Sequence, residues 1–308
     1  MESPEVESKS DLKVVLQFFI VPLSLVAVLV SLFFGLQFLR QRRPDPETTL
    51  RALQHYDGFL GAVVGDLKRW QSGYDLSLLL RAQSPEDLRR MVPDLAAALR
   101  DAGVRRDLKL RRYLTLALGY AGDPRAAAPL AEALRDDDPE TRLNAAWGLV
   151  QTGSDQALPE LRQALRDPDP GVRKMAAYGL GALADHEAAT ALRAALSDTE
   201  VDVGWNAALA LARISDPAAI PTLRAMLDRG LAAPRAGEID RGTGAGELTL
   251  NAVRALALLL PEQEAKAQLE RVAASGDAAA RAAALAALQG VETPGAKGVA
   301  VAAPSEIR

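Results

Sequence analysis

Few residues of this chain have side chains suited to covalent chemistry. The 308 residues include no cysteine and only two histidines, His55 and His186. The absence of cysteine excludes disulfides, thiolate metal ligands and Cys-His nucleophiles, and no Gly-x-Ser-x-Gly motif marks a nucleophilic serine. We interpret His186, which directly follows Asp185, as a solvated turn residue and His55 as a structural one. We therefore predict no catalytic residue, no metal site and no cofactor, and expect that the protein is not an enzyme.

A glycine-rich hexapeptide at residues 241–246 superficially resembles a phosphate-binding loop. A nucleotide-binding loop follows a β-strand, and its glycine spacing directs backbone N–H groups to phosphate at the start of a helix. This hexapeptide instead lies in an insertion, residues 228–247, that contains the helix breakers Gly230 and Pro234. Long loops in compact repeats are uncommon and often functional. The insertion is therefore either a partner-specific element or a plain linker, and no small-molecule substrate is evident.

Regularly spaced arginines are the stronger candidates for binding. Arg162, Arg193 and Arg224 are 31 residues apart, and a second set of arginines lies four positions further along. The two sets fall one turn apart on predicted helices, so together they could bind an acidic peptide or the acidic tail of a partner. Neighbouring acids, Asp136, Asp167 and Asp198 among them, could instead neutralise the arginines and leave a solvated face. We name the candidates the basic strip: Arg100, Arg135, Arg162, Arg166, Arg193 and Arg224.

The same spacing of 31 residues runs through the apolar positions and predicts the elements that carry these arginines. Paired alanines such as Ala176 and Ala177 would let neighbouring helices pack closely. Each repeat is predicted to contain a first helix, a short turn, a second helix and an acidic turn such as residues 167–170. Three columns of leucines keep one register: Leu118, Leu149, Leu180 and Leu211; Leu130, Leu161, Leu192 and Leu223; Leu134, Leu165, Leu196 and Leu227.

A further column, made of three aspartates and a serine, predicts where the second helices begin. Its side-chain oxygens would accept hydrogen bonds from orphan N–H groups of the first turn. Incomplete repeats flank the regular ones, at residues 95–101, 251–256 and 280–288. Because a single repeat buries too little apolar surface to fold alone, stability must come from repeats stacked in series. The capping residues are Asp123, Ser154, Asp185 and Asp216, and Pro124 and Pro217 follow two of them at the first helical position.

These repeats resemble a known family, the short HEAT-like repeats found in phycobilisome lyases and many bacterial proteins. The stretch at residues 167–198, DPDPGVRKMAAYGLGALADHEAATALRAALSD, has the family pattern of acidic turn, Val-Arg, paired alanines, Leu-Gly, Asp and two spaced leucines. The resemblance covers roughly residues 95–288 and implies an all-α fold, a right-handed α-solenoid of helical hairpins. It also implies that Arg142 and Arg173 bond the acidic turns, with a gap in that ladder at Gly204.

The resemblance leaves the function open, because such repeats serve as many kinds of scaffold. It admits a bilin-lyase-like enzyme or enzyme accessory. Deoxyhypusine hydroxylase has a similar fold, but its two irons are held by several His-Glu pairs, and this chain contains only His186-Glu187. A formal net charge of −4 gives no support to nucleic-acid binding, which favours a basic excess.

Residues 14–39 form a run of 26 positions without a charged side chain. A helix of this length exceeds the roughly 30 Å hydrocarbon core of a bilayer, so the run is predicted to be a transmembrane helix. A cleaved signal peptide is the competing interpretation, but the acidic residues before the run and the missing Ala-x-Ala site favour a retained anchor. Small residues on one face, Ala27, Ser31 and Gly35, could allow another membrane helix to approach closely.

The arginines that follow the span, Arg40, Arg42 and Arg43, predict its orientation. Lysine and arginine beside a span tend to stay in the cytoplasm, which favours an inner-membrane protein with a cytoplasmic solenoid, and a periplasmic one as the alternative. The predicted organisation is an acidic tail at 1–13, the span at 14–39, a juxtamembrane helical linker at 40–75, the solenoid at 76–288 and a disordered tail at 289–308. The predicted function is a single-pass membrane scaffold that holds or helps assemble a protein partner, with a membrane complex among the candidates.

Overall fold

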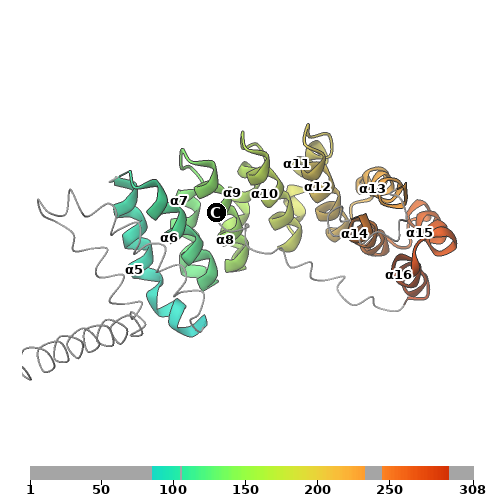
Figure 1. The fold of residues 1–308 in the computed structure, drawn as a ribbon, viewed down its shortest axis with the longest axis horizontal. Coiled ribbons are helices and arrows are strands. Elements are labelled where there is room, and N and C mark those ends of the chain that lie inside the picture. The colour runs from blue at the N-terminus through green and yellow to red at the C-terminus, as the bar shows by residue number, and fades with distance from the viewer. Residues whose placement is uncertain (1–84, 105, 233–244, 291–308) are drawn as a thin grey trace, which may run out of the picture. The chain divides into compact units, whose positions relative to one another are not determined.

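The computed structural model describes residues 85–104, 106–232 and 245–290, which belong to one compact unit. This part of the chain is entirely helical and contains no β-strand (Figure 1). The predicted span at 14–39 with Ala27, Ser31 and Gly35, the segments at 1–13 and 40–75 and the tail beyond residue 290 lie outside the described residues. Within the described ranges, no helix is both long and apolar enough to cross a bilayer.

The helices alternate between first and second helices, as the repeat pattern predicts. The second helices of four consecutive repeats begin with a 3₁₀ turn that runs directly into an α-helix. The first helices are α6 (Leu108–Ala121), α8 (Pro139–Thr152), α10 (Pro170–Ala182), α12 (Val201–Arg213), α14 (Ala245–Leu258) and α16 (Ala278–Leu288). The second helices are α5 (Pro85–Val104), α7 (Ala127–Ala133), α9 (Leu158–Ala164), α11 (Ala189–Ala195), α13 (Ile220–Ala232) and α15 (Gln263–Ser275).

The predicted capping column is confirmed. Asp123, Ser154, Asp185 and Asp216 each accept a hydrogen bond from the backbone N–H two residues further on, at the N-cap of a 3₁₀ turn. The first helices have a second set of caps: Asp138 accepts from the N–H of Thr141, and Asp169 from that of Val172. Such caps satisfy N–H groups that have no partner inside the helix. The regular repeat therefore specifies where both of its helices begin.

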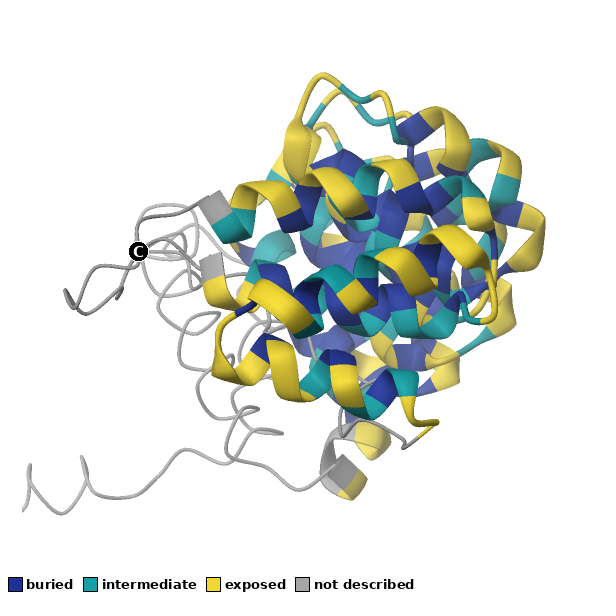
Figure 2. Cartoon of the chain, turned by 90° about the vertical axis from the view of Figure 1, so that its right-hand side faces the viewer, coloured by how far each residue is buried: buried dark blue, intermediate teal, exposed yellow. Residues whose placement is uncertain are grey.

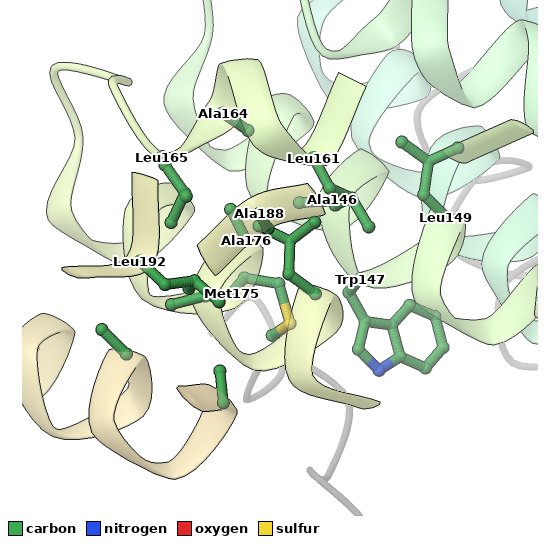
Figure 3. Close-up of a cluster of buried hydrophobic side chains, with 14 of the residues drawn as sticks. Ala146, Trp147, Leu149, Leu161, Ala164, Leu165, Met175, Ala176, Ala188 and Leu192 are labelled. Atoms are coloured by element: carbon green, nitrogen blue, oxygen red, sulfur yellow. The ribbon is translucent and has the colours of Figure 1, made fainter. Parts of the chain in front are cut away.

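The core consists of layers between successive helices. The twelve leucines of the three columns are buried except Leu134 and Leu196, which are partly buried. Figure 2 shows the buried positions gathered between the helices, and Figure 3 shows Leu161 and Leu192 of two successive second helices near Ala146 and Ala176 of the first helices. Complete burial of a leucine side chain stabilises a fold by about 1.5–3 kcal/mol. Each layer is thus held by the layers beside it.

Small residues let the first helices approach one another closely. α6 packs on α8, α8 on α10, α10 on α12, and α12 on α14. A Cβ atom added to Gly181 of α10 would lie 2.6 Å from the Cα of Ala210 in α12, and one added to Gly179 would lie 2.5 Å from a methyl of Val150 in α8. These distances are well below van der Waals contact, so glycine is required at both positions for the observed helix spacing.

A ladder of ion pairs connects the acidic turns, as the family resemblance implied. Nε and Nη2 of Arg142 donate to both oxygens of Asp167 at 2.8 and 2.9 Å, and Nη1 donates to the carbonyl oxygens of Asp136 and Asp137. Arg173 repeats this arrangement with Asp198 at 2.8 Å. One repeat earlier, Arg111 pairs with Asp136 at 3.1 Å. The side chains of these six residues are 9–16% exposed, so the pairs are largely withdrawn from water.

The insertion predicted at residues 228–247 is shorter in the structure. α13 continues to Ala232 and α14 begins at Ala245, and residues 233–244 lie outside the described ranges. The earlier second helices are followed within a few residues by an acidic turn and by Pro139 or Pro170. Residues 228–232 contain no proline, and the helix tolerates Gly230 because a glycine costs only about 1 kcal/mol inside a helix. Asp228 in this extension binds Arg271 of α15, with 2.6 Å between Oδ1 and Nη1.

Candidate binding site

Two arginines of the basic strip take part in a second ladder. Arg162 donates to both carboxylate oxygens of Asp185, with 2.8 Å between Nη2 and Oδ1, and Arg193 pairs with Asp216 at 2.6 Å. Both carboxylates are N-caps of the next second helix, and their side chains are 3% and 7% exposed. The predicted neutralising acids Asp136, Asp167 and Asp198 are occupied instead by the arginines of the first helices. Arg162 and Arg193 therefore join consecutive repeats.

The other arginines of the basic strip are exposed to solvent. Arg135 forms a surface ion pair with Glu160 at 3.1 Å, and Arg224 lies 3.9 Å from Asp228 one turn away. Arg100 and Arg166 are exposed and have no ion pair within the described ranges. Arg100 and Arg135 line one hollow between α5 and α7, and Arg135 and Arg166 line a second one, but carboxylates line both as well. The strip is thus divided between arginines that bind buried carboxylates and a mixed surface, and its role in binding stays a prediction.

Both ladders stop at the repeat formed by α12 and α13. The first-helix arginine is replaced by Gly204, and the acidic residue 31 positions after Asp198 is replaced by Arg229. A Cβ atom on Gly204 would lie 3.1 Å from the carbonyl oxygen of Leu196, which leaves little room for a larger residue. In the second ladder, the N-cap residue of the next second helix, α15, is Glu262, and its side chain makes no capping bond. Arg224 therefore lacks the capping aspartate that Arg162 and Arg193 bind. This repeat therefore lacks both connections that its predecessors make.

A hollow of about 580 Å³ opens beside this repeat. It is formed by side chains from α10, α12, α13 and α14, and its volume is in the range of small-ligand and peptide pockets. The apolar lining consists of Met175, Tyr178, Trp205, Leu209, Met226 and Leu248. The polar and charged lining consists of Lys174, Asp202, Asn206, Arg213, Arg229, Glu247 and Asn251. We name this set of residues the α12 hollow.

The aromatic rings of the α12 hollow each carry a guanidinium group. The guanidinium carbon of Arg213 lies 5.5 Å from the ring centre of Tyr178, and that of Arg229 lies 5.5 Å from the ring centre of Trp205. Both distances are typical of cation–π contacts. Trp205 occupies the repeat position at which Arg112, Leu143 and Lys174 stand in the preceding repeats. The rings and the arginines thus form one connected surface across α10, α12 and α13.

Arg213 differs from the arginines of the ladders because it has no carboxylate partner. No acid of the described ranges lies within ion-pair distance of this side chain, although it is half-buried. Burial lowers the pKa of Arg213 from its usual value, because water solvates the guanidinium less well there. Its position in the last turn of α12 favours a cation through the helix dipole. That interaction does not use the hydrogen-bonding fork of the guanidinium, which remains available for an anion.

The remaining candidates for chemistry do not come together. His186 and Glu187 lie exposed in the turn before α11, and no group of metal-binding side chains occurs in the described ranges. Arg162 also pairs with Glu187. His55 lies outside the described residues. Nothing in the described helices therefore resembles an assembled catalytic site.

The sequence analysis missed the residues of the α12 hollow. The signal was available in the departures from the 31-residue columns: an arginine in place of an aspartate at position 229, and a tryptophan at position 205. Only the gap at Gly204 was recognised. Arg213 gave no such signal, because its column also holds the unrelated residues Tyr120, Gln151 and Ala182.

Comparison with known proteins finds a family model and solved structures that are similar to these repeats. A family model described as HEAT repeats matches residues 92–170 and 158–238. No curated protein sequence matches the chain. The complex of CpcE and CpcF of phycocyanin lyase from Nostoc sp. PCC7120 is similar, with 28% identity over 59% of this chain and 71% of that chain and a TM-score of 0.42.

Two other solved structures are similar over a longer part of the chain. Human deoxyhypusine hydroxylase in complex with glycerol shares 21% identity over 80% of this chain and 85% of its own, with a TM-score of 0.32. A designed armadillo repeat protein shares 19% identity over 80% of this chain and 100% of its own, with a TM-score of 0.40. The region that matches the HEAT repeat model thus contains, in its described residues, the stacked helix pairs that the repeat pattern predicts.

Proposed function

We propose that this protein is a binding scaffold that holds a protein partner in the α12 hollow and performs no reaction of its own. The observation that carries the proposal is the loss of both ladders at the α12 repeat, in the place where aromatic rings and unpaired arginines line a hollow. Structural pairings are repeated in the preceding units, whereas Trp205, Arg213 and Arg229 of the hollow are not. Residues that serve only to stack the repeats would be expected to follow the repeat.

The composition of the α12 hollow supports a protein as the partner. Tryptophan, tyrosine, methionine and arginine are enriched in the centres of protein interfaces, where a few side chains supply most of the binding energy. The hollow contains all four types. Its charges are mixed, with Asp202 and Glu247 among the lining residues, which disfavours a nucleic-acid backbone. A solenoid also presents binding residues from several repeats to one partner.

The experiment that tests this proposal is purification of the tagged full-length protein from its native host in mild detergent, with quantitative mass spectrometry of copurified proteins. The test variant is Trp205→Ala with Arg229→Ser. The matched control is Lys266→Gln on α15, an exposed cation outside the hollow. A stoichiometric partner that is lost only in the test variant supports the proposal. A partner retained by the test variant refutes the hollow as its site, and a copurified chromophore would favour the bilin-lyase-like alternative.

We also propose that residues 14–39 anchor the scaffold in the inner membrane, with the repeats in the cytoplasm. The support is the length of the uncharged run and the arginines that follow it. Carbonate extraction of membranes provides the test: the full-length protein should remain in the pellet, and a chain that begins after Arg43 should be released. Release of the full-length protein would refute the anchor. Protease protection in spheroplasts would distinguish a cytoplasmic from a periplasmic solenoid.

A further inference from the structure

The α12 hollow has a surplus of positive charge at one point. Lys174 lies 3.8 Å from Asp202, so these two lining charges offset each other. Arg229 lies over Trp205, and Arg213 over Tyr178, without a carboxylate of the described ranges within reach. Glu247 is the remaining acid of the lining and is exposed at the start of α14. The half-buried Arg213 is therefore the cation whose charge is least compensated.

The surface beside Arg213 is apolar. Leu209 lies one turn before Arg213 on α12, and Met226 of α13 is buried to 1% exposure within the same lining. The half-buried rings of Tyr178 and Trp205 complete this surface. A ligand that reached Arg213 would cover the exposed parts of Leu209, Tyr178 and Trp205, and their burial would contribute about 25 cal/mol per Å² of apolar surface removed from water. The hollow thus combines one anion-binding point with an apolar wall.

From this arrangement we infer that the α12 hollow binds a segment of the partner protein in which a carboxylate side chain lies next to a large apolar side chain. The inference rests on the proposed function and specifies its ligand. The carboxylate would accept a bidentate hydrogen bond from Arg213, while the apolar side chain packs on Trp205 and Leu209. A guanidinium matches a carboxylate in geometry as well as in charge.

Two further observations favour a single carboxylate over a polyanion. Asp202 and Glu247 would repel additional negative charges along the lining. The lowered pKa of Arg213 shows that its charged form is incompletely solvated, so one well-placed anion would offset that cost. A phosphate chain would instead require several cations in succession, whereas Lys174 of the lining is paired with Asp202 and Arg229 lies over Trp205.

The test begins with selection of phage-displayed random heptapeptides on the full-length protein in detergent. The expected result is enrichment of peptides with a glutamate or aspartate within two positions of a large apolar residue. One enriched peptide is then synthesised with its acid intact and with the acid changed to the amide, and both affinities are measured by fluorescence anisotropy. Arg213→Gln should weaken the acidic peptide by about tenfold or more, because a charge-assisted hydrogen bond is lost.

Three controls keep the result interpretable. Arg213→Lys, which keeps the charge but not the planar fork, should restore part of the affinity. Lys266→Gln should bind like the original protein, because this side chain lies outside the hollow. The amide peptide should bind the original protein and Arg213→Gln equally. Circular dichroism of each variant separates a lost contact from a lost fold.

The outcomes separate this inference from the proposed function. Acidic peptides bound equally by Arg213→Gln would overturn the inference but leave the scaffold in place. Phenylacetate that binds as tightly as the peptide would assign the hollow to a small carboxylate and overturn a protein ligand. Peptide binding that appears only after Glu238→Gln and Asp240→Asn would assign it to the chain's own residues 233–244. The absence of both enriched peptides and copurified partners would refute the proposed function itself.

Discussion

The repeats from α6 to α11 and the repeat of α12 and α13 share the same 31-residue period, but their arginines have different partners. In the first group, Arg142 and Arg173 each bind the aspartate of the next acidic turn. Arg162 and Arg193 each bind the aspartate that caps the next second helix. In the α12 repeat two arginines from other repeat positions, Arg213 and Arg229, lie over aromatic rings. The α12 repeat therefore lacks the connecting ion pairs, and its half-buried Arg213 has an aromatic ring as its neighbour instead of a carboxylate.

The change at the α12 repeat involves both members of a pair. A buried arginine left without its aspartate is costly, whereas replacing both partners can be nearly neutral. Gly204 removes the arginine, and Arg229 removes the acid in the same step of the ladder. The stacking of α12 on α10 and α14 continues without this pair because apolar contacts hold those helices together.

Substitution of a ladder arginine should produce the largest effect. Arg142→Ala is expected to lower the free energy of unfolding by about 3 kcal/mol, because Asp167 would remain buried without its counter-ion. Arg229→Ala, outside the ladder, should cost at most about 1 kcal/mol, the value of an exposed cation–π contact. Urea unfolding followed by circular dichroism measures both. Equal losses in the two variants would contradict the distinction between the regions.

Substitution of a glycine in the regular stack should cause the second largest loss of stability. Gly181→Ala places a Cβ atom 2.6 Å from the Cα of Ala210, so α10 and α12 must move apart. The expected loss is about 2 kcal/mol, the usual cost of overpacking a well-packed contact. The thermal midpoint should fall accordingly. An unchanged midpoint would show that the contact between α10 and α12 yields more easily than the ladder.

Acid should weaken the ladder by protonating its aspartates. The hydrogen bond from Arg173 holds the pKa of Asp198 below its usual value, although burial opposes this. A folded-state pKa below the unfolded value of about 3.9 gives stability that is complete above that value and is lost as the pH falls through the lowered pKa. The destabilisation caused by Asp198→Asn should therefore be large at pH 7 and shrink below about pH 4. Urea midpoints at several pH values test this, and a constant difference would refute it.

The smallest change in stability is expected at a glycine where an added Cβ atom would contact no other atom. Gly246 is exposed in the first turn of α14, and a Cβ atom there would meet no atom within 4 Å. Gly246→Ala should raise stability by about 0.5 kcal/mol, because alanine loses less conformational entropy in a helix. This variant is the counterpart of Gly181→Ala, and a loss of stability would indicate a contact at this position.

The predictions from the sequence succeeded where each residue acts within its repeat or on the next one. The leucine columns, the caps Asp123, Ser154, Asp185 and Asp216, and the pairs of Arg142 and Arg173 all follow from the period or from the family resemblance, and the structure confirms them. Local hydrogen bonds and a repeated register allow the roles of such residues to be predicted from the repeat pattern.

The partners of Arg162 and Arg193 were misjudged because spacing alone cannot tell which of several nearby aspartates a long side chain reaches. Asp185 and Asp216 already served as caps in the prediction, and the structure shows that they also accept from these arginines. The end of α13 was also misplaced, since a helix without a proline stop can continue into residues that other repeats use for a turn.

The sequence alone therefore determined the helical repeats and their caps, because these depend on contacts at fixed spacing along the chain, and the family resemblance implied the acidic-turn ladder. Only the tertiary structure decided the α12 hollow. Its wall combines α10, α12, α13 and α14, and the half-burial of Arg213 depends on how those four helices lie against one another. Burial and the absence of a partner are properties of packing in space, and no periodic pattern encodes them.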